Sequence, residues 1–361
     1  MPIAGRGGGI ERHAAELPAA LLEVDPSLRL VVIASRDLPP QPWEDAASVL
    51  RLPLPDDGRL NTIVQLAGTP LGGLARRLDL IHSVSNVGPP AVPGLKTVTT
   101  VHDLIWLHAG TDWGTPEAVT AMRRVALRSA RWATRVQASS LSTAADLQEH
   151  GGVKPASIDV VPLGVSAGFA TPEPEDVIRE RLSLGTAPVV LAVAQKRPYK
   201  NLAAAIEALD AVPDAVLVLP GAPTDHEREL KELARARGVD ARVRFPDWVD
   251  DSTLEGLYGL AACVVVPSFF EGFGFPVLEA MARGVPVACA RSASLPEVAG
   301  DAALLFDPHS GDELAGAMRR LVADGALRAR LRAAGVQRAA EYTWRRCAEE
   351  TLASYRRALD G

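Results

Sequence analysis

The sequence predicts an α/β protein with two parallel, doubly wound sheets. Apolar strand-like runs alternate with helical patterns along almost all of its 361 residues, and this alternation is typical of parallel sheets. The length favours two domains over one. Residues 164–188 are the expected linker, because they contain the proline- and acid-rich stretch 171–176. We therefore expect domains at 1–168 and 169–344, with a last helix over 345–361 that crosses back onto the first.

The expected elements follow in chain order. In the first half, the strand candidates are residues 28–35, 80–84, 97–101 and 135–138. In the second half, they are residues 189–194, 215–219, 243–245, 262–267, 285–290 and 303–306. Helical patterns lie between most of them and include residues 177–184, 202–209, 277–283 and 344–359.

Composition excludes several classes of protein. The chain is 47% hydrophobic and 23% charged with a net charge of -6, so no overall basic field attracts nucleic acid. Cys263, Cys289 and Cys347 are widely spaced without a CxxC pair, which is typical of a reduced, cytoplasmic protein. No apolar run approaches the length of a membrane span, and residues 1–9 lack the apolar core of a signal peptide.

The most informative block is residues 271–279, EGFGFPVLE, directly after the strand candidate 262–267. Gly272 and Gly274 would let the backbone approach a ligand closely. The helix that follows would offer free N–H groups to an anion such as a phosphate. Glu271 and Glu279 could hold hydroxyl groups. At the carboxyl end of a strand, this combination indicates a site for a phosphorylated, hydroxyl-rich molecule such as a nucleotide sugar.

A basic cluster, KRPYKN at residues 196–201, lies between a strand candidate and a helical run. Cations at that position could neutralise a pyrophosphate, and fixed cations stabilise a leaving diphosphate most in the transition state. A solvated basic turn explains the same residues equally well. The glycine-rich stretch 5–10 precedes another helical run and could cradle a phosphate, although it matches neither GxGxxG nor a Walker loop.

Two further features lie in the first half. His102 ends the strand candidate 97–101 and could bond a substrate hydroxyl, although a lone histidine is more often structural. The spacing of Arg124, Arg128, Arg131 and Arg135 places four guanidinium groups on one helical face, next to Arg123. That face could bind an anionic acceptor such as a lipid phosphate or the membrane surface, or could simply be solvated.

Missing motifs narrow the chemistry. The sequence has no D-x-D motif to hold a divalent metal on a nucleotide sugar, and no HExxH, GxSxG or Walker lysine loop. Its cysteines and histidines do not show metal-ligand spacing. We therefore expect neither a metal nor another cofactor.

Taken together and in order, the motifs resemble those of the retaining GT-B glycosyltransferases of the GT4 type. The resemblance extends from Gly7 to about Leu331, and its most specific part, residues 268–287, is similar to the E-x7-E block of that family. The supporting stretches are residues 7–17, 99–104, 160–165, 196–202, 245–258 and 295–308.

The resemblance implies two Rossmann-like domains, with the donor held mainly by the second. Glu271 would contact hydroxyls of the donor sugar and Glu279 those of the ribose. Arg197 and Lys200 would lie on the diphosphate, and His102 near the donor sugar. The other donor-binding positions it implies are Gly8, Gly9, Val249, Gly272, Phe273, Gly274, Phe275 and Val277.

Two departures from the family pattern stand out. Family members begin with a strand before the glycine loop, whereas only residues 1–6 precede Gly7 here. Either the start is truncated or misassigned, or a central strand is lost, which would expose paired sheet edges. The basic segment is also compact, so either Lys196 or Arg197 could act together with Lys200.

The expected function is metal-independent transfer of a hexose from a nucleoside-diphosphate sugar to a hydroxyl, with retention of configuration. GDP-mannose is the first candidate donor, and UDP-, dTDP- and other GDP-sugars stay open. The acceptor is a glycan, a lipid-linked molecule or a small molecule, with Arg124, Arg128 and Arg131 as candidate acceptor-side residues. The protein would be cytoplasmic, and the arginine face would allow peripheral membrane association. Two alternatives are an NAD-dependent two-domain oxidoreductase and a non-catalytic nucleotide- or sugar-binding protein.

Overall fold

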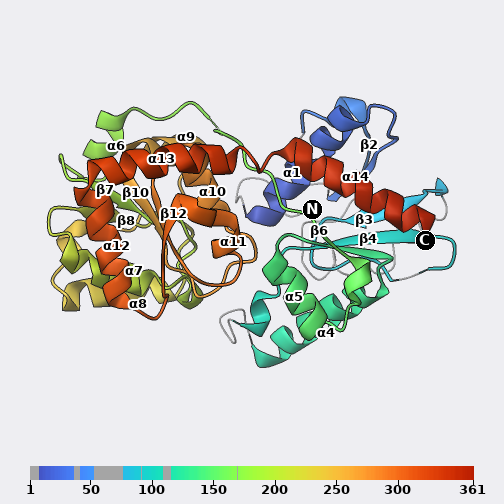
Figure 1. Cartoon of the computed structure of the whole chain (residues 1–361), viewed down its shortest axis with the longest axis horizontal. Helices are drawn as coiled ribbons and strands as arrows, with labels where there is room; N and C mark the ends of the chain where they lie inside the picture. Colours follow the sequence, from blue (N-terminus) through green and yellow to red (C-terminus); the bar gives the residue numbers. More distant parts are fainter. Residues whose placement is uncertain (1–7, 36–40, 53–75, 91, 109–114, 169) are drawn as a thin grey trace. The chain divides into compact units, whose positions relative to one another are not determined.

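The structure is a computed structural model that describes residues 8–35, 41–52, 76–90, 92–108, 115–168 and 170–361. The chain forms two compact units, Met1–Gly164 with Tyr342–Gly361, and Val165–Glu341 (Figure 1). The chain passes from one unit to the other after residues 164 and 341, close to the boundaries at 168 and 344 that the sequence predicts. Every pair of named strands is parallel, which confirms the α/β class.

The described strands of the first unit form two sheets. The four-stranded sheet has the order β3 (Leu80–Ser83), β4 (Lys96–Val101), β5 (Arg135–Ala138) and β6 (Ile158–Val160). A separate parallel pair consists of β1 (Val31–Ser35) and β2 (Ser48–Leu52). The sequence analysis did not predict β2 or β6. The strand that family members place before the glycine loop would fall in residues 1–7, outside the described residues.

Helices cover both faces of the four-stranded sheet. The helix α1 (Gly9–Val24) packs against the C-terminal helix α14 (Trp344–Asp360), which also packs on β4 and β5. The helices α4 (Pro116–Trp132) and α5 (Leu141–Glu149) lie on the opposite face (Figure 1). Side-chain oxygens of Thr115, Ser140 and Thr343 cap α4, α5 and α14. The last helix therefore belongs to the first unit.

The second unit is built around one sheet of six parallel strands, in the order β12-β11-β10-β7-β8-β9. Its strands are β7 (Val189–Leu191), β8 (Val216–Val218), β9 (Val243–Arg244), β10 (Ala261–Val266), β11 (Val287–Ala290) and β12 (Ala303–Phe306). The chain begins at β7, moves outward through β8 and β9, and then returns to the other side of β7 with β10. The two central strands, β7 and β10, are almost fully buried, which explains their continuous apolar runs.

Helices surround this sheet. They are α6 (Glu175–Arg181), α7 (Leu202–Ala208), α8 (His226–Ala236), α9 (Asp251–Leu260), α10 (Phe275–Ala282), α11 (Leu295–Ala299), α12 (Gly311–Ala323) and α13 (Gly325–Ala339). The short 3-10 helices in the described part of the chain are η1 (Glu44–Ala46), η3 (Ile105–Leu107), η5 (Pro155–Ser157), η6 (Pro198–Lys200), η7 (Leu209–Ala211), η8 (Asp240–Arg242) and η9 (Gly300–Ala302). Within the described residues, no helix is long and apolar enough to cross a membrane.

The structure corrects one prediction for the first unit. Arg135 does not continue the arginine face of α4, because the helix ends at Trp132 and Arg135 lies on β5. Its guanidinium donates to both carboxylate oxygens of Asp159 on β6, at 2.9 and 2.5 Å. The arginine face therefore consists of Arg124, Arg128 and Arg131, all exposed, with the exposed Arg123 next to it in the sequence.

Candidate active site

The strand order of the second unit creates a switch point between β7 and β10. The chain leaves these two neighbours toward opposite sides of the sheet, and ligands in open α/β sheets bind at the carboxyl ends of strands at such a point. Residues 196–201 follow β7 and residues 268–274 follow β10. The fold therefore brings together the two clusters that the sequence singled out in the second half of the chain.

Glu271 and Lys200 form a largely buried ion pair at this point. The Lys200 Nζ donates to both carboxylate oxygens of Glu271, at 2.7 and 2.8 Å. The two side chains are 13% and 10% exposed. The Lys200 ammonium also lies 5.1 Å from the ring centre of Tyr199. The pair combines one fixed cation with one hydrogen-bond acceptor.

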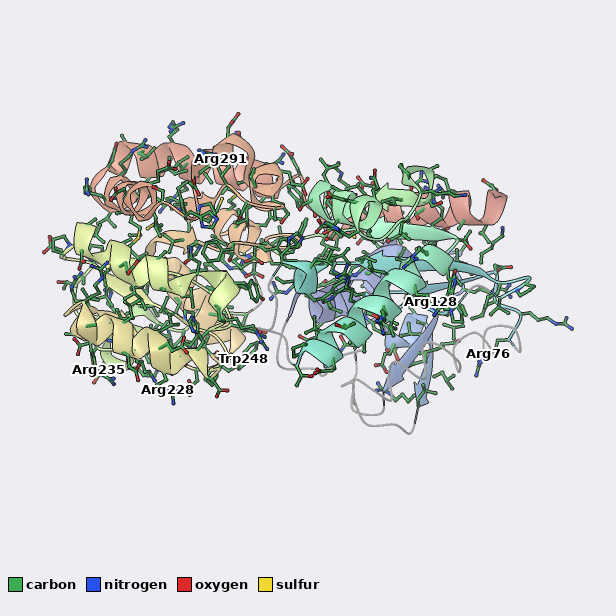
Figure 2. All side chains as sticks on the ribbon, turned by 90° about the horizontal axis from the view of Figure 1, so that it is seen from below. Arg76, Arg128, Arg228, Arg235, Trp248 and Arg291 are labelled. Carbon is green, nitrogen blue, oxygen red and sulfur yellow. The ribbon has the colours of Figure 1, made fainter. Side chains whose placement is uncertain are left out.

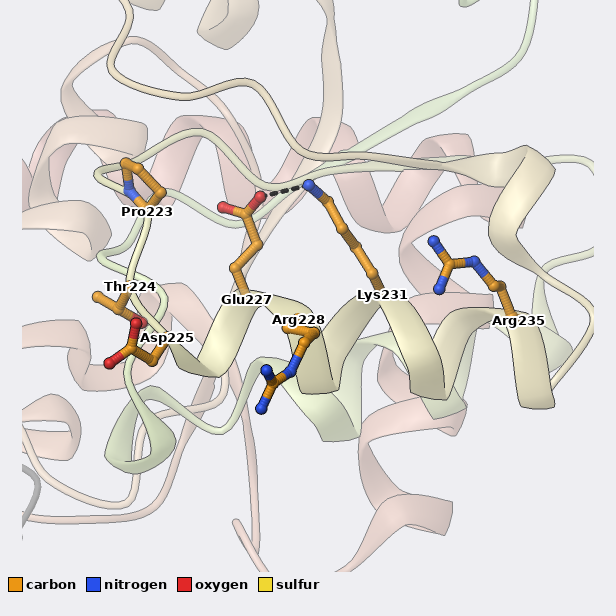
Figure 3. Close-up of a pocket in the computed structure, with 7 residues that line it drawn as sticks. All are labelled: Pro223, Thr224, Asp225, Glu227, Arg228, Lys231 and Arg235. Carbon is orange, nitrogen blue, oxygen red and sulfur yellow. Dashed lines mark ion pairs between the residues drawn. The ribbon is translucent and has the colours of Figure 1, made fainter.

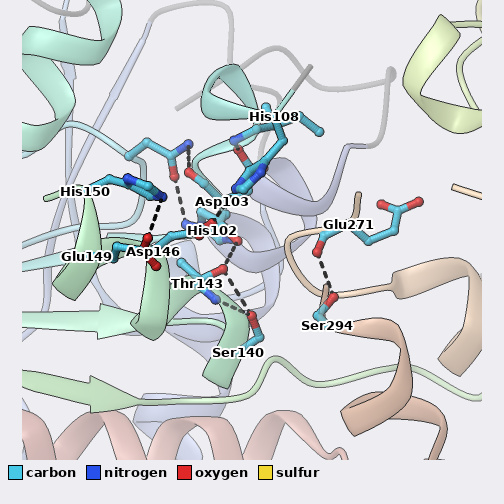
Figure 4. A network of polar contacts seen from close by, with 12 residues as sticks. His102, Asp103, His108, Ser140, Thr143, Asp146, Glu149, His150, Glu271 and Ser294 are labelled. Atoms are coloured by element: carbon cyan, nitrogen blue, oxygen red, sulfur yellow. Dashed lines mark hydrogen bonds and ion pairs between the residues drawn. The ribbon is translucent and has the colours of Figure 1, made fainter. Parts of the chain in front are cut away.

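Two serines fix the loop that carries Glu271. The Ser268 hydroxyl donates to Glu271 Oε1 at 2.7 Å. The buried Ser294 hydroxyl lies 2.8 Å from the carbonyl oxygens of both Glu271 and Phe273 (Figure 4). Gly274 has φ 108, and a Cβ there would lie 3.0 Å from a methyl group of Leu295. A glycine is therefore needed where the loop enters α10.

Glu279 is the second buried acid, at 5% exposure. Its Oε2 accepts a hydrogen bond of 2.9 Å from the hydroxyl of Tyr258 on α9. Its backbone carbonyl accepts one of 2.9 Å from Arg283 Nη1. Arg283 also donates to both carboxylate oxygens of Glu255, at 2.8 and 2.5 Å. The second acid is thus held by a network that joins α9 to α10.

The two basic neighbours of Lys200, Lys196 and Arg197, have different surroundings. Lys196 is fully buried, and its Nζ donates to the carbonyl oxygens of Gly221 at 2.6 Å and Pro246 at 3.1 Å. Burial lowers the pKa of this ammonium, against the opposing charge of Glu227 at 3.2 Å. Lys196 therefore stabilises loops, and Arg197 is left as the candidate partner of Lys200. Arg197 is half-buried and donates to Gln195 at 3.2 Å.

Asn201 anchors the basic cluster. It adopts the left-handed conformation (φ 53, ψ 36) just before α7. Its side-chain amide donates to the carbonyl oxygens of Pro267 at 3.1 Å and Pro308 at 3.0 Å. One amide thus joins the segment after β7 to the segments after β10 and β12.

The remaining donor-side predictions have different surroundings. Gly272, Phe275 and Val249 are half-buried, and Phe273 is buried with its ring 5.2 Å from that of Phe275. Val277 is fully buried in the core, and its N–H donates to the Gly274 carbonyl. Its side chain therefore supports the helix and is not accessible to a donor. Trp248, next to Val249, is 46% exposed and points outward (Figure 2).

In the first unit, His102 is buried after β4. Its Nε2 lies 3.0 Å from the carbonyl oxygen of Val84, which can only accept, so Nε2 carries the proton. Burial lowers the pKa of His102 to about 4, although the Val84 carbonyl opposes this effect. At neutral pH the ring is uncharged and Nδ1 is an acceptor. The one side-chain hydrogen bond of His102 to a described residue is made by Nε2.

The backbone around His102 is also fixed. Its N–H donates to Asn86 Oδ1 at 2.8 Å. Its carbonyl accepts from the hydroxyls of Ser139 at 2.7 Å and Thr143 at 3.2 Å (Figure 4). The imidazole is therefore a neutral, rigidly mounted group, suited to accept a hydrogen bond from a hydroxyl.

Gly8 and Gly9 lie at the start of α1. Gly8 caps the helix in an extended conformation, and Gly9 is its first residue. The Gly8 N–H donates to the Glu11 carboxylate. An acidic group therefore occupies the helix N-terminus where the sequence suggested a phosphate, and Gly5 to Gly7 lie outside the described residues. The candidate acceptor residues Arg124, Arg128 and Arg131 are exposed on α4, and Figure 2 labels Arg128.

A separate pocket of about 700 Å³ lies beside α8. Charged residues dominate its lining, and its Glu227 pairs with Lys231 at 2.5 Å (Figure 3). None of the predicted site residues lines it. Among the described residues, no three His, Cys, Asp or Glu side chains are grouped as metal ligands.

Two family models together match most of the chain. Residues 7–169 match the model named Glycosyltransferase Family 4, and residues 175–338 match Glycosyl transferases group 1. A D-inositol 3-phosphate glycosyltransferase of Acidothermus cellulolyticus is 32% identical over 99% of this chain and 88% of its own length. The chain belongs to glycosyltransferase family 4. It is a glycosyltransferase that uses a sugar donor.

Two further relatives of this glycosyltransferase are named as mannosyltransferases. An MMP alpha-(1->4)-mannosyltransferase of Mycolicibacterium hassiacum is 28% identical over 93% of this chain and 87% of its own. An O-antigen chain mannosyltransferase B of Escherichia coli is 33% identical, but the match covers 46% of this chain and 45% of that protein.

Solved structures show that the glycosyltransferase has the GT-B fold. A sucrose-phosphate synthase from Thermosynechococcus elongatus has a TM-score of 0.77 at 20% identity, covering 99% of this chain and 95% of its own. The Anabaena protein HepE, solved with UDP and glucose, has a TM-score of 0.72 at 22% identity, covering 98% of each chain.

Sequence reasoning missed the residues that hold the site of the glycosyltransferase in place. Tyr258, Ser294 and Asn201 each contact a predicted site residue or join two site segments. Asn201 could have been noticed as an asparagine just before a helix, where a left-handed conformation is common. Tyr258 and Ser294 carry no local signal, because their partners lie about twenty residues away in the sequence.

Proposed function

We propose that this glycosyltransferase moves a hexose, mannose from GDP-mannose as first candidate, to an acceptor hydroxyl with retention of configuration. The buried Glu271–Lys200 pair at the switch point is the observation that carries the proposal. It pairs a hydroxyl acceptor with a cation at the place where open α/β sheets bind ligands. The names of the mannosyltransferase relatives support the choice of sugar.

Each site residue has a role in this proposal. Glu271 accepts hydrogen bonds from hydroxyls of the donor sugar, and Glu279 from those of the ribose. Lys200 and Arg197 neutralise the charge that develops on the diphosphate as the sugar–phosphate bond breaks. The neutral His102 accepts a hydrogen bond from a sugar hydroxyl. These cations would make a metal unnecessary.

Retention follows if the acceptor attacks from the face that the diphosphate leaves. The bond between the anomeric carbon and the phosphate oxygen breaks, and a bond to the acceptor oxygen forms. The acceptor proton passes to the leaving phosphate, whose negative charge has just increased. The acceptor hydroxyl belongs to a glycan, a lipid-linked molecule or a small molecule.

The surface of α4 supports peripheral attachment to the inner face of a membrane. Its arginine face also carries an apolar side chain, because Trp132 follows Arg128 by one helical turn and is 41% exposed. The Arg128 guanidinium lies 5.0 Å from the ring centre of Trp132. Arginine and tryptophan together suit the interface of an anionic bilayer. We propose this face as the contact with the membrane or with a lipid phosphate.

The donor is tested by adding GDP-, UDP- and dTDP-sugars to the protein and measuring the melting temperature. We expect GDP-mannose to give the largest increase. Turnover with that donor is then measured for Lys200→Ala and Glu271→Ala, with the exposed Lys154→Ala as control. Loss of a fixed cation at the diphosphate should lower kcat by about 100-fold or more. Near-normal turnover in both folded variants would contradict the site, and stabilisation by another sugar would replace GDP-mannose.

A further inference from the structure

The hydroxyl of Tyr258 connects the core of the second unit to the candidate ribose acid. Tyr258 is fully buried on α9, and its hydroxyl donates to Glu279 Oε2 at 2.9 Å. A buried tyrosine needs a partner for its hydroxyl, whereas a phenylalanine would fill the same space without one. The choice of tyrosine here is therefore explained by what its hydroxyl does to the Glu279 carboxylate.

Charges behind the tyrosine fix it in place. The Arg283 guanidinium lies 4.9 Å from the centre of the Tyr258 ring. It is bonded to Glu255, one helical turn before Tyr258, and the Arg283 and Glu255 side chains are each 6% exposed. Arg283 follows Glu279 by four residues and caps the C-terminal end of α10. Two links therefore join α9 to the α10 segment, one from Tyr258 to Glu279 and one from Arg283 to Glu255. Together they oppose rotation of either helix relative to the other.

The bond restricts the Glu279 carboxylate to one orientation. An isolated glutamate can rotate its carboxylate plane freely, and a ligand must then bear the entropic cost of fixing it. With Oε2 held by Tyr258, Oε1 and the second lone pair of Oε2 keep a constant direction. The two adjacent ribose hydroxyls form a vicinal diol, which is best bound by a carboxylate whose acceptor lone pairs keep a fixed direction.

We infer that Tyr258 is a positioning residue that presets Glu279 for the ribose diol of the nucleotide, and so makes the enzyme select ribonucleotides over deoxyribonucleotides. This inference rests on the proposed role of Glu279 at the ribose. It adds a residue that touches no substrate. It also adds a property that can be measured without turnover, namely the preference for ribonucleotides over deoxyribonucleotides.

The test compares Tyr258→Phe with the wild-type enzyme in calorimetric binding of GDP, UDP and their 2′-deoxy forms. We expect the wild type to bind the better ribonucleotide at least about 10-fold more tightly than its deoxy form, because the loss of a bonded hydroxyl leaves a buried acceptor unpaired. In Tyr258→Phe, affinity for the ribonucleotide should fall several-fold, whereas affinity for the deoxy form should hardly change. The selectivity ratio should therefore shrink, and in turnover the donor KM should rise without a matching fall in kcat.

A matched control removes another buried tyrosine hydroxyl. Tyr355 in the first unit lies 2.7 Å from His82 Nδ1, so Tyr355→Phe should cost stability without changing the selectivity ratio. If the wild type is selective and folded Tyr258→Phe keeps the same selectivity ratio, the inference about Tyr258 is overturned, whereas the proposed role of Glu279 stands. A wild type that binds both forms equally would instead remove Glu279 from the ribose, and the inference with it. Glu279→Gln, which should also lose selectivity, shows that the ratio reports on this acid.

Discussion

At the scale of single residues, the buried His13 and His102 and the half-buried His82 lie together in the first unit. The ring of His13 lies 5.1 Å from that of His102 and 6.5 Å from that of His82, and it stacks on Trp344 at 6.1 Å. His82 is bonded to Tyr355 and Thr100, at 2.7 Å each. Burial, and secondly the neighbouring His102, lower the pKa of His82 to about 3. Burial and both other histidines place the pKa of His13 well below its ordinary value.

These lowered pKa values make the first unit sensitive to acid. Unfolded histidines take up protons below about pH 6.5, whereas His82 and His102 stay neutral in the fold until about pH 3 and 4. Stability is therefore complete above pH 6.5 and falls as the pH decreases toward 4. Each histidine costs about 1.4 kcal/mol per pH unit, so the two should cost about 4 kcal/mol at pH 5.

Urea unfolding between pH 7.5 and 5 measures this loss. Tryptophan fluorescence reports mainly on the first unit, because Trp248 alone of the six tryptophans belongs to the second. His82→Gln should flatten the pH dependence, and His226→Gln, in the second unit, should leave it unchanged. An unfolding free energy that is equal at pH 7.5 and pH 5 would show that the cluster does not titrate as described.

At the scale of elements, the helix α4 separates its functions by face. Ala126, Leu127 and Ala130 are buried against the first unit, while the arginine face looks outward. Like charges at these spacings repel one another, which costs the helix a little stability. An anionic surface would turn that cost into attraction.

Vesicle sedimentation measures that attraction. The full chain should bind vesicles that contain phosphatidylglycerol and not vesicles of phosphatidylcholine alone, and salt should weaken the binding. Each arginine near such a surface contributes about 1 kcal/mol, so Arg124→Gln with Arg128→Gln should weaken binding roughly 30-fold. The matched control is Arg228→Gln with Arg235→Gln, two exposed arginines on α8. Equal losses in the two pairs would refute a specific role for α4.

Elements differ in how far the sequence could predict them. Buried parallel strands such as β10 and β11 were predicted closely, because a strand covered on both faces has one continuous apolar run. The strand β2 was missed because it contains Ser48 and Arg51 and stays partly exposed. The strand β6 was missed because it has three residues with Asp159 at its centre. An aspartate in this strand is explained only by its hydrogen bonds from Arg135 and Ser354, which come from distant parts of the chain.

The same limit applies to the site. Motifs indicated Glu271, Lys200 and Glu279, because glycines, strand ends and charges lie next to one another in the sequence. No local pattern could separate Lys196 from Arg197, since the carbonyl groups that hold Lys196 come from residues 221 and 246. The roles of the site residues stay predictions until the variants are measured.

At the scale of the whole molecule, the C-terminal helix α14 completes the first unit. Its Tyr355 bonds His82, and its Ser354 and Arg357 lie 2.7 and 2.9 Å from the Asp159 carboxylate. Burial opposes ionisation of Asp159, but hydrogen bonds from Arg135 and Ser354 and the nearby arginine charges outweigh it and lower its pKa. At the start of this helix, Trp344 packs closely on Gly164. A Cβ on residue 164 would lie 2.4 Å from the backbone nitrogen of Trp344.

Deletion of residues 342–361 should therefore unfold the first unit selectively. It removes the partners of His82, His13 and Asp159 and exposes the faces of α1 and β4. Limited proteolysis should digest the first unit of the shortened chain and leave a fragment close to residues 165–341. Arg345→Ala, which breaks an exposed ion pair with Glu23, should keep the full-length pattern. Equal protection of the first unit with and without α14 would contradict its role.

The crossing of α14 also sets an order for biosynthesis. Residues 165–341 form one compact unit from a single continuous stretch of chain, so this unit can fold as soon as it leaves the ribosome. The first unit is synthesised earlier, but it must wait with an uncovered sheet face until the last helix has been made. The half of the enzyme that is translated first is thus completed last, and during that interval it is the half most exposed to chaperones, proteases and aggregation.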